Sequence, residues 1–520
     1  MGVTSTQSPI RVAFVPGHLT GLPGRIGITI GPGKRDDRWQ RDLDDDLSRL
    51  REAHRVDLLV SLMQPDERQA LGMQALPERA AALGLEFREL PVVDGSVPDS
   101  PAELEALVRS IVEAAAAGRN VVVHCRGGLG RSGMTVAAVL CARGLDAEHA
   151  IAEVRRVRPG AVETEAQARA VRAFPRADRP DLPVRFDRFA GCLLGGAIGD
   201  ALGYPIEFDN AHSIVTRWGQ SAPEPLAYAD VPPAIISDDT QMTLFTAEGL
   251  IACDEPRQVI DRIQAAYLRW LATQTGSPAA GGWLLGIERL HARRAPGNTC
   301  LSALIAQRQH PHQPSVSAVP NDSKGCGAIM RSAPIGLAAA SREIAFELGR
   351  DAGVLTHGHP SGYLSAGYFA ALIHDLSRGG DLREAMTAAD GLLACEFGAA
   401  ETQSAVALAK ELSLSGPPSA AALEALGGGW TGESALGIAL SCVLSSDTVP
   451  ATLWRAVAHG GDSDSTGSLV GNLLGALHGT GALPARWREE VELCDVIATV
   501  AADLYDQSVL GARMDREKYG

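Results

Sequence analysis

The sequence predicts a two-domain protein in which an α/β domain comes first and a mainly helical domain follows. Its 520 residues exceed the length of an ordinary single domain. Strand and helix patterns alternate in the first third of the chain. A proline-rich stretch at 175–186 then separates this third from a long region in which apolar residues recur at helical spacing.

Short apolar runs and one long amphipathic pattern define the elements of the first third. Strands are expected at 57–63, 85–93 and 120–125. Helices are expected at 101–118, 131–143, 147–157 and 163–175. Strands and helices that alternate in this way form a sheet whose functional site lies at the carboxyl ends of the strands.

Beyond the proline-rich stretch, alanine, leucine and glycine dominate, and β-branched or aromatic runs are sparse. Amphipathic helical spacing recurs at 245–254, 258–272, 366–376 and 435–444. These patterns predict a mainly helical second domain. We place the two domains at 1–175 and 186–520, with a linker at 176–185.

The composition favours a protein of a reducing compartment. The net charge of −15 opposes non-specific binding to nucleic acid or to an anionic membrane. The nine cysteines form no C-x-x-C pair, as is typical of reduced thiols. We find neither a long uninterrupted apolar stretch nor the layout of a signal peptide. We therefore expect a cytoplasmic protein with no membrane partner; a nucleic-acid acceptor stays open but is not indicated.

The stretch HCRGGLGRSG at 124–133 places a thiol where a buried strand gives way to a glycine-rich loop and a helix. Converging backbone N–H groups and the positive helix end can stabilise a Cys125 thiolate and receive an anion. Arg131 can grip phosphate oxygens in a bidentate way, and Ser132 can help the thiolate leave a phosphocysteine. Three glycines let this backbone curl tightly: Gly127, Gly128 and Gly130.

Phosphoryl transfer to sulfur also needs an acid for the departing oxygen. The candidate is Asp94 in LPVVDGSVPD, a loop that follows a strand. The alternative is a buried structural cysteine followed by a glycine turn and a helix cap. We favour phosphate chemistry because the thiol, the glycines and the arginine occur together in one short stretch.

This loop resembles the His-Cys-x5-Arg-Ser loop of cysteine-dependent protein phosphatases. With DGSVPD upstream and VRRVRPGAVETEAQ downstream, the region 10–175 is similar to the dual-specificity branch that includes the kinase-associated phosphatase. The resemblance implies a phosphorylated substrate, with Cys125 as nucleophile, Arg131 as phosphate clamp and Asp94 as general acid. It also implies that Gln167 helps to place water.

The arginines near the end of this region, among them Arg155, Arg156 and Arg158, crowd together. We interpret them as a solvated helix face. A docking surface for phosphorylated substrates is the alternative.

Two acidic segments stand out in the second domain, SDDTQM at 237–242 and HGGDSDSTGSLVG at 459–471. Singly, each predicts a helix cap. Together they offer more carboxylates and hydroxyls than caps need, and such hard oxygen ligands suit Mg²⁺, Mn²⁺ or Ca²⁺. Spacing alone does not show whether the two segments meet.

Five segments follow one another in the order seen in ADP-ribosylglycohydrolases: 189–208, 237–242, 321–337, 356–363 and 459–471. This resemblance covers about 186–513. It implies an all-α domain that holds two Mg²⁺ or Mn²⁺ ions and hydrolyses the bond between ADP-ribose and an acceptor. The implied metal ligands are Ser237, Asp238, Asp239, Asp462, Asp464 and Ser465. Glu207 is implied as an acidic residue beside the metals and the ribose.

The segment SKGCGAIMR resembles the family loop that wraps the pyrophosphate, where small residues let backbone N–H groups approach the anion. The residues expected there are Ser323, Lys324, Gly325, Cys326 and Gly327. Some relatives carry Asn at the position of Cys326. His357, in THGHPSGY, is expected on the adenosine side. The pair His357 and His359 is more typical of loop packing than of a zinc site.

Together, the resemblances imply a bifunctional hydrolase with a metal-dependent glycohydrolase activity and a cysteine-dependent phosphatase activity. Two alternatives stay open: the first domain is a phospho-binding targeting module, or the second is an ADP-ribose sensor without turnover. The expected partners are an ADP-ribosylated protein or an ADP-ribose-containing small molecule, and a phosphorylated substrate. The acceptor is left open among arginine, serine, nucleic acid and a metabolite.

Overall fold

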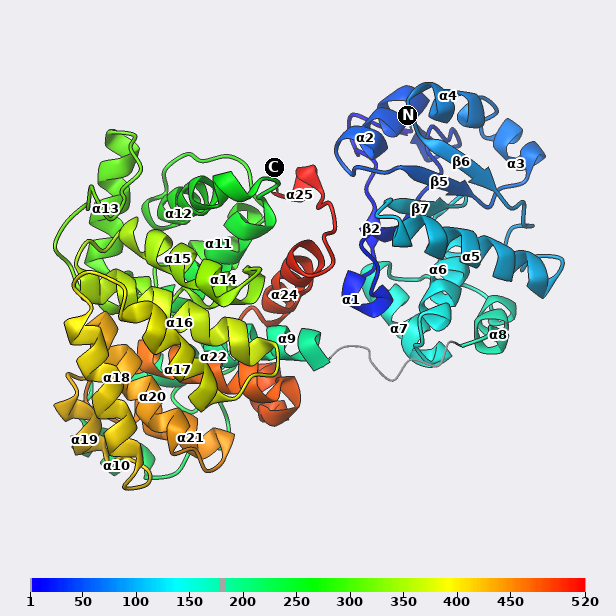
Figure 1. The fold of residues 1–520 in the computed structure, drawn as a ribbon. Helices are drawn as coiled ribbons and strands as arrows, with labels where there is room; N and C mark the ends of the chain where they lie inside the picture. Colours follow the sequence, from blue (N-terminus) through cyan, green and yellow to red (C-terminus); the bar gives the residue numbers. More distant parts are fainter. Residues whose placement is uncertain (1, 177–183, 520) are drawn as a thin grey trace. The chain divides into compact units, whose positions relative to one another are not determined.

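The computed structural model describes residues 2–176 and 184–519, which form two compact units (Figure 1). The first unit comprises residues 1–183 and 506–520, and the second comprises Val184–Tyr505. The predicted linker at 176–185 falls mostly outside the described residues. The predicted second domain, 186–520, extends too far, because residues 506–520 pack with the first unit.

A five-stranded sheet forms the centre of the first unit. Its strands follow the order β2-β3-β7-β5-β6, and all neighbours are parallel except β2 and β3. The bounds are β2 (Ala13–Phe14), β3 (Ile26–Thr29), β5 (Leu58–Ser61), β6 (Glu86–Glu89) and β7 (Val121–His124). The predicted α/β architecture is confirmed. The sequence patterns missed β2 and β3; Gly27 within β3 weakens its strand signal. A separate pair joins β1 (Val3–Thr4) to β4 (Trp39–Gln40).

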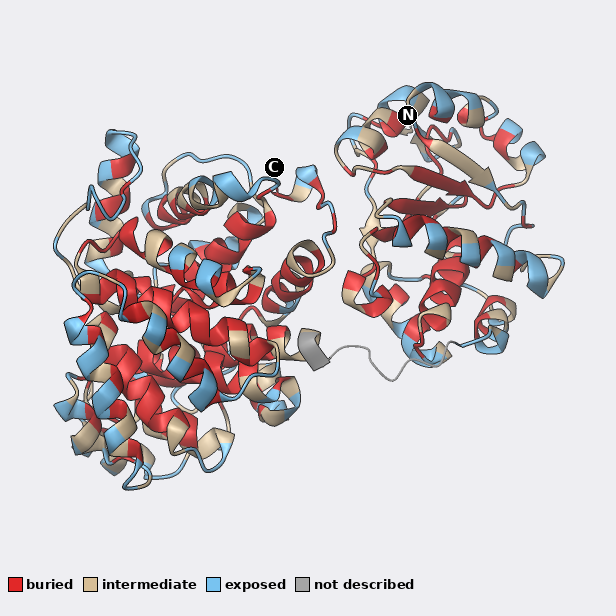
Figure 2. Cartoon of the chain, in the orientation of Figure 1, coloured by how far each residue is buried: buried red, intermediate tan, exposed pale blue. Residues whose placement is uncertain are grey.

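Helices complete this unit. The predicted ones are present as α5 (Pro101–Ala116), α6 (Gly130–Ala142), α7 (Ala147–Val157) and α8 (Glu165–Ala173). Four short segments add to them: α1 (Gly17–Thr20), α2 (Leu43–Glu52), α3 (Pro65–Ala70) and α4 (Leu76–Ala82). A capping box of Ser100 and Glu103 fixes the start of α5. The strands β5 and β7 and the helix α6 are buried, so the core lies between the sheet and this helix (Figure 2).

The C-terminal segment completes the first unit. Met514 and Tyr519, in and before α25 (Arg516–Tyr519), are buried. The Asp515 carboxylate lies 2.7 Å from Nδ1 of His54. Arg513 pairs with Asp57 beside β5. The chain thus returns to its first unit after passing through the second.

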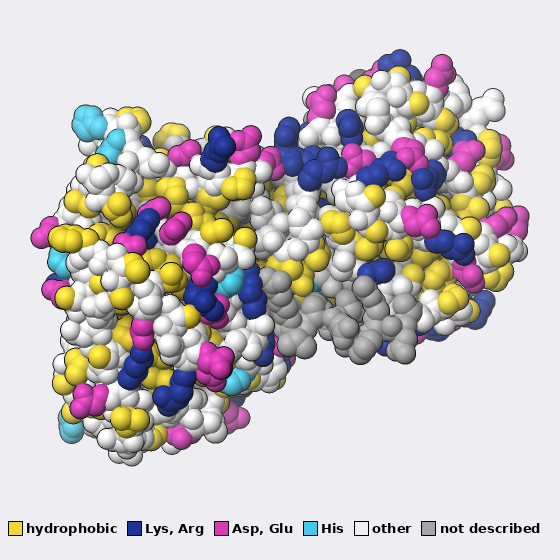
Figure 3. All heavy atoms as spheres, in the orientation of Figure 1, with side chains coloured by type: hydrophobic (Ala, Val, Ile, Leu, Met, Phe, Trp, Pro, Cys, Tyr) yellow, Lys and Arg dark blue, Asp and Glu magenta, His cyan; other side chains and the backbone are white. Residues whose placement is uncertain are grey.

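The second unit is helical. Its helices are α9 (Val184–Gly203), α10 (Ala211–Trp218), α11 (Asp238–Ile251), α12 (Val259–Thr275), α13 (Asn298–Gln309), α14 (Ala333–Ala338), α15 (Arg342–Val354), α16 (Pro360–Ser377), α17 (Leu382–Leu393), α18 (Ala400–Ser413), α19 (Ala420–Ala425), α20 (Gly432–Leu444), α21 (Val449–Val457), α22 (Ser463–His478), α23 (Ala485–Glu490) and α24 (Cys494–Ser508), which runs on into the first unit. The predicted helical domain is confirmed. Acidic and basic side chains are interspersed on its visible face (Figure 3).

Glycines at every fourth position let α9 and α22 approach each other to backbone contact. A Cβ atom at Gly199 would lie 1.9 Å from the carbonyl oxygen of Gly467. A Cβ atom at Gly471 would lie 1.9 Å from the carbonyl oxygen of Gly195. Larger residues would push the helices apart. This contact places the end of α9 beside the start of α22.

One described segment, Phe186–Ile206, is long and apolar enough to cross a membrane by length and composition, which the sequence analysis overlooked. In the structure 78% of its apolar window is buried inside the unit. This burial is typical of a core helix.

Two candidate active sites

Cys125 lies at the carboxyl end of β7, the central strand of the sheet, where the chain turns into α6. The thiol is buried. The loop curls back against the end of β3. Gly128 has a φ of +63°, and a Cβ atom there would lie 2.2 Å from the carbonyl oxygen of Thr29. Only glycine fits this turn.

Arg131 and Ser132 present unused polar atoms at this loop. The terminal nitrogens of Arg131 donate to both carboxylate oxygens of Glu67, at 2.7 and 2.8 Å. Its Nε and the Oγ of Ser132 are buried and have no hydrogen-bond partner among the described residues. Buried polar atoms rarely lack partners, so these two fit an anionic ligand at the loop.

The predicted acid and the predicted water-placing residue both lie beside the loop. Oδ1 of Asp94 is 2.9 Å from Nη2 of Arg131, and the Asp94 side chain is 62% exposed. Gln167 is buried, and it donates to the carbonyl oxygen of Ser96 at 3.3 Å, in the loop that carries Asp94. A Cβ atom at Gly130 would lie 2.8 Å from Nε2 of Gln167. The structure thus groups these residues, while their roles stay predictions.

Two residues that hold this loop escaped the sequence analysis. Glu67 in α3 binds Arg131. In the sequence, the signal that could have indicated Glu67 was an acidic residue just after the predicted strand 57–63. Arg158 donates to the carbonyl oxygens of Gly127 and Gly128, at 2.9 and 3.0 Å. The interpretation of a solvated helix face is therefore wrong for Arg158. Arg155 is exposed on α7, as that interpretation expects, and its side chain also donates to backbone carbonyls at 3.0 and 3.1 Å.

In the second unit, the contact of α9 with α22 brings the acidic segments together. Glu207 follows α9, and Asp462 and Asp464 begin α22. One carboxylate oxygen of each of these three residues lies within 4.8 Å of the others. Asp238 and Asp239, the first residues of α11, line the same cavity of about 190 Å³. The two segments therefore meet, which spacing alone did not show.

Burial and mutual repulsion raise the pKa values of these acids. Burial, followed by the charge of Asp464, raises the pKa of Glu207 to about 8. The same two causes raise the pKa values of Asp238, Asp239 and Asp462 well above the usual range. Crowded buried carboxylates of this kind need a compensating positive charge.

The oxygen atoms present fit a hard divalent cation. Oδ2 of Asp239 and Oε2 of Glu207 are buried without a hydrogen-bond partner among the described residues. Carboxylates and hydroxyls are the ligands that Mg²⁺ and Mn²⁺ prefer. The residues around the cavity that could hold such an ion are Glu207, Asp238, Asp239, Asp462, Asp464 and Ser465.

Ser237 acts as a helix cap, which was the simpler of its two interpretations. Its Oγ accepts from the N–H of Asp239 at 3.2 Å, and Ser237 is not among the residues that line the described cavity. In contrast, Asp462 stands at the N-cap position of α22 and makes no side-chain cap bond. The carboxylate of Asp462 is thus not committed to capping.

Asp200, which the sequence analysis missed, positions the start of α11. It is fully buried in α9 and accepts from the backbone N–H groups of Ser237 and Thr240, at 2.9 and 3.1 Å. Burial, followed by the charge of Asp464, raises its pKa to about 7. The segment that carries Asp238 and Asp239 is therefore fixed by a carboxyl group of the neighbouring helix.

The glycine loop contributes backbone and a thiol to the cavity. Gly325, Cys326 and Gly327 line it, and Sγ of Cys326 donates to Oδ2 of Asp462 at 2.8 Å. His357 also lines it, and burial lowers the pKa of His357 to about 3, so the ring is neutral. Gly327 fits because a Cβ atom there would lie 2.9 Å from this ring.

Two residues of the predicted pyrophosphate loop are not among the residues that line the acidic cavity. Nζ of Lys324 pairs with Glu401 at 3.1 Å, and Lys324 lines a different cavity, of about 390 Å³. Its ammonium group is therefore not placed to bind pyrophosphate in the acidic cavity. Oγ of Ser323 bonds to Oγ1 of Thr299 at 3.1 Å. Such loops bind an anion through backbone N–H groups. The direction of a side chain therefore does not show whether the backbone of that residue binds the anion.

An aromatic pair at the cavity was also missed. Trp430 lines the cavity, and its ring stacks on Phe208 with centroids 6.1 Å apart. Phe208 is 79% exposed and follows Glu207 directly. Tertiary contact alone pairs these rings, since they come from distant segments.

The fold and the two sites define a protein that joins a cysteine-phosphatase-like α/β domain to a helical domain with a buried carboxylate cluster. Residues 181–512 match the ADP-ribosylglycohydrolase family, and the chain belongs to that family. Residues 40–174 match the family described as Swiss Army Knife protein, DSP-PTPase phosphatase domain. Both resemblances read from the sequence are confirmed.

The chain matches two relatives of known name over most of their length. The chain is 26% identical to ADP-ribosyl-[dinitrogen reductase] glycohydrolase of Rhodospirillum rubrum over 318 residues, 60% of this chain and 92% of that protein. It is 27% identical to ADP-ribosylhydrolase ARH3 of Danio rerio over 353 residues, 61% of this chain and 90% of that protein. A crystal structure of kinase associated phosphatase is 22% identical, with a TM-score of 0.31, over 32% of this chain and 95% of that one.

Proposed function

We propose that the helical domain hydrolyses the bond between ADP-ribose and an acceptor with the help of two divalent cations, Mg²⁺ or Mn²⁺. The observation that carries this proposal is the convergence of Glu207 with the acids of α11 and α22 around one cavity. Family membership supports it. The relatives named above, a glycohydrolase and an ADP-ribosylhydrolase, point to the same bond.

The chain's own residues have distinct roles in this proposal. The aspartates of α11 and α22 hold the cations, which when bound supply a nucleophilic water at neutral pH. Glu207, whose carboxylate lies beside those of Asp462 and Asp464, can exchange a proton with the departing acceptor. The backbone of Gly325 to Gly327 receives the pyrophosphate. The neutral ring of His357 offers hydrogen bonds without charge.

A panel of ADP-ribosylated acceptors tests this proposal. Release of ADP-ribose is measured with Mg²⁺, Mn²⁺ or EDTA for the wild type and for Asp462→Asn/Asp464→Asn. We expect the double variant to lose about a hundredfold or more, since even residues outside the ligand set change metal sites by that much. Glu224→Gln, which neutralises an acid whose side chain is 89% exposed, is the control.

Release that persists in the double aspartate variant would contradict the metal-site assignment. Binding of ADP-ribose without release from any acceptor would favour the alternative of an ADP-ribose sensor.

We further propose that the first domain hydrolyses phosphomonoesters. Sγ of Cys125 attacks phosphorus, the P–S bond forms as the P–O bond breaks, and Asp94 gives its proton to the departing oxygen. Water then attacks the phosphocysteine, and the thiolate leaves beside Ser132. The unpartnered Nε of Arg131 and Oγ of Ser132 support this proposal. So does the position of Asp94, whose Oδ1 lies 2.9 Å from Nη2 of Arg131.

Turnover of p-nitrophenyl phosphate and of phosphopeptides tests the phosphatase proposal. We expect Cys125→Ser to abolish turnover and Asp94→Asn to lower it about a hundredfold, because general acids contribute that much or more. Cys395→Ser, at an exposed cysteine, is the control. Phosphopeptide binding by a wild type that shows no turnover would favour the targeting-module alternative.

The fusion suggests that both domains serve one pathway, for instance on a target that carries ADP-ribose and phosphate, or on a phosphorylated ADP-ribose product. Mixed assays in which neither reaction alters the other's substrate would remove this link. All nine cysteines are free in the structure, which supports the proposal of a reducing, cytoplasmic location.

A further inference from the structure

A lysine that belongs to no known motif of the sequence lies against the thiol loop. The strands β3 and β7 are parallel neighbours, so the segments that follow them emerge at the same edge of the sheet. The N–H of Gly31 donates to the carbonyl oxygen of Arg126 at 3.3 Å. Nζ of Lys34 donates to the same oxygen at 3.2 Å. Lys34 therefore contacts the residue that follows the nucleophile.

The Lys34 ammonium group is buried and lacks a carboxylate partner. Lys34 is 5% exposed, and no ion pair joins it to an acid within residues 2–176 or 184–519. Its other neighbour is the face of Trp39, with Nζ 5.5 Å from the ring centroid. A buried cation without a counter-charge is costly, so an incoming anion would compensate it.

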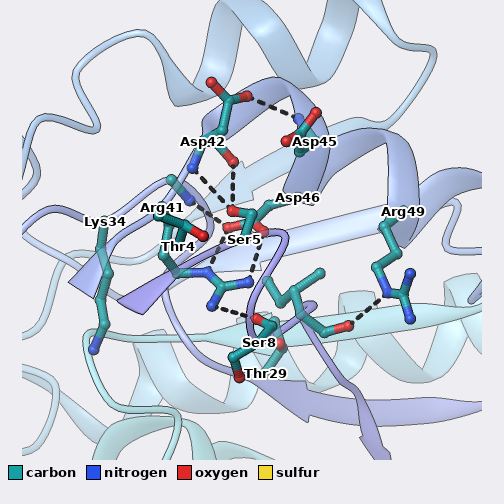
Figure 4. Close-up of polar contacts among 12 residues, drawn as sticks. Thr4, Ser5, Ser8, Thr29, Lys34, Arg41, Asp42, Asp45, Asp46 and Arg49 are labelled. Atoms are coloured by element: carbon teal, nitrogen blue, oxygen red, sulfur yellow. Dashed lines mark hydrogen bonds and ion pairs between the residues drawn. The ribbon is translucent and has the colours of Figure 1, made fainter. Parts of the chain in front are cut away.

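A rigid network holds Lys34 in this place. Asp46 binds the buried guanidinium of Arg41 through two hydrogen bonds of 2.7 Å and also accepts from the N–H of Gly33 at 2.9 Å. The N–H of Arg41 donates to the carbonyl oxygen of Lys34 at 3.2 Å. In Figure 4 the Lys34 side chain points away from the Arg41 and Asp46 pair, and no contact is drawn between Lys34 and the labelled acids. The backbone is thus fixed, while no carboxylate of the described residues forms an ion pair with the ammonium group.

The surrounding charges give the same picture. Burial lowers the pKa of Lys34; among its neighbours Asp36 opposes this, Arg126 and Arg41 add to it, and Cys125 opposes it. Asp36 is the one acid among these groups, and its Oδ2 lies 3.9 Å from Nη2 of Arg126. The loop beside Lys34 also carries the unpartnered Nε of Arg131 and Oγ of Ser132.

We propose that Lys34 is a further cation of the phosphate site, which holds the Arg126 carbonyl group in place and stabilises the negative charge of a phosphate bound at the Cys125 loop. The ligand class is a tetrahedral oxyanion, either free or as the phosphate of an ester. This inference rests on the proposed phosphate chemistry of the loop. It does not require turnover.

Tungstate, a tetrahedral oxyanion, serves as the probe for a test on the full-length protein. Its affinity is measured by calorimetry, and thermal unfolding is followed in buffer without phosphate. We expect Lys34→Met, which keeps most of the side-chain volume, to weaken tungstate binding about tenfold or more. We expect the same variant to unfold at or above the wild-type temperature, because it removes an uncompensated buried charge. A purely structural lysine would instead lower the unfolding temperature.

Two further variants make the test specific. Arg38→Met removes one positive charge from the same loop, also over the Trp39 ring, and should leave tungstate affinity unchanged. Lys34→Arg keeps the charge and should retain affinity within about threefold. If Lys34→Met does not fold, Lys34→Arg still tests the inference. Loss of tungstate affinity in the folded Lys34→Arg variant, which keeps the positive charge, would contradict a role of that charge.

The outcomes separate this inference from the proposed phosphatase activity. Tungstate binding that is unchanged in Lys34→Met overturns the inference alone. Weakened binding in Lys34→Met, together with absent turnover in the wild type, supports the inference and overturns the phosphatase. A wild type that binds no tungstate overturns both.

Discussion

At the scale of single residues, two of the metal-ligand candidates depend on a carboxyl group that is not among the residues lining the cavity. Asp200 lies in α9, and its oxygens accept from the N–H groups of Ser237 and Thr240, which fixes the first turn of α11. An amide at this position offers one acceptor oxygen and turns an N–H group toward these donors. We therefore regard Asp200 as a positioning residue for Asp238 and Asp239.

Asp200→Asn is expected to weaken Mg²⁺ binding about tenfold and to lower the free energy of unfolding by about 1–3 kcal/mol, the usual cost of unsatisfied buried donors. Calorimetric titration with Mg²⁺ and chemical denaturation measure the two effects. The exposed acid variant Glu224→Gln should change neither. Unchanged Mg²⁺ affinity in Asp200→Asn would show that α11 holds its first turn without this carboxyl group.

The raised pKa values predict how stability depends on pH when no metal is bound. Burial raises the pKa of Asp200 to about 7 and that of Glu207 to about 8, above their ordinary values of 3.8 and 4.5. The folded protein then binds more protons than the unfolded chain between about pH 4 and 8. The stability of the second unit in EDTA should therefore fall as the pH rises through this range.

Thermal unfolding at pH 5.5 and 7.5 in EDTA tests this expectation. The unfolding temperature should be lower at pH 7.5, and added Mg²⁺ should raise it more at pH 7.5 than at pH 5.5. The variant Asp200→Asn/Glu207→Gln removes two of the titrating groups and should weaken the pH dependence. An equal pH dependence in this variant would assign the effect to other groups.

At the scale of elements, the C-terminal segment is a structural part of the first unit. It buries Ala512, Met514 and Tyr519, and the N–H of Arg516 donates to the carbonyl oxygen of Ala53 at 3.1 Å. His54 lies against Asp515, and Arg49 pairs with Glu517. These contacts fix the end of α2 and the start of β5, on which the sheet and the thiol loop depend.

Deletion of residues 509–520 should destabilise the first unit by about 3 kcal/mol or more, because burial of one methionine-sized side chain contributes about 1.5–3 kcal/mol. Hydrogen exchange of the amides of α2 and β5 in the full-length and shortened proteins measures this locally. Asp515→Asn/Glu517→Gln, which removes the ion pairs but keeps the apolar burial, should show a smaller effect. Equal exchange in the shortened protein would exclude a structural role of the tail.

At the scale of the whole molecule, the two sites use different chemistry and belong to separate units. The thiol loop offers a nucleophile, an arginine and an acid, and none of these requires a metal ion. The acidic cavity offers carboxylates that suit one. The two activities should therefore respond separately to chelation and to substitution.

EDTA is expected to abolish ADP-ribose release and to leave phosphoester turnover within about twofold, since only one site contains the acidic ligand set. Cys125→Ser should give the reverse pattern. Both reactions are assayed on one preparation of the full-length protein, with Cys395→Ser as the control. Loss of both activities in either condition would indicate that the two units are coupled.

Local patterns in the sequence were sufficient for the thiol loop and for the order of the domains. The thiol loop is a continuous segment, so Cys125, Arg131 and Ser132 are readable from spacing alone. Asp94 depended on resemblance as well, and the structure places it beside Arg131. The first-unit strands that were missed are short, and such strands carry little periodic signal.

The sequence by itself determined the two kinds of domain, the nucleophile loop and the two acidic segments, because each is encoded within a few neighbouring residues. Only the tertiary structure decided that the acidic segments meet, that Asp200 holds one of them, and that Lys34 and Arg158 contact the thiol loop. It also decided that the last residues of the chain belong to the first unit. The physical reason is that these contacts join residues far apart in the chain, and their partners are chosen by packing. The close approach of α9 and α22 through Gly199 and Gly471 is such a case. The spacing of the glycines is visible in the sequence, but the sequence does not show which helix packs against them.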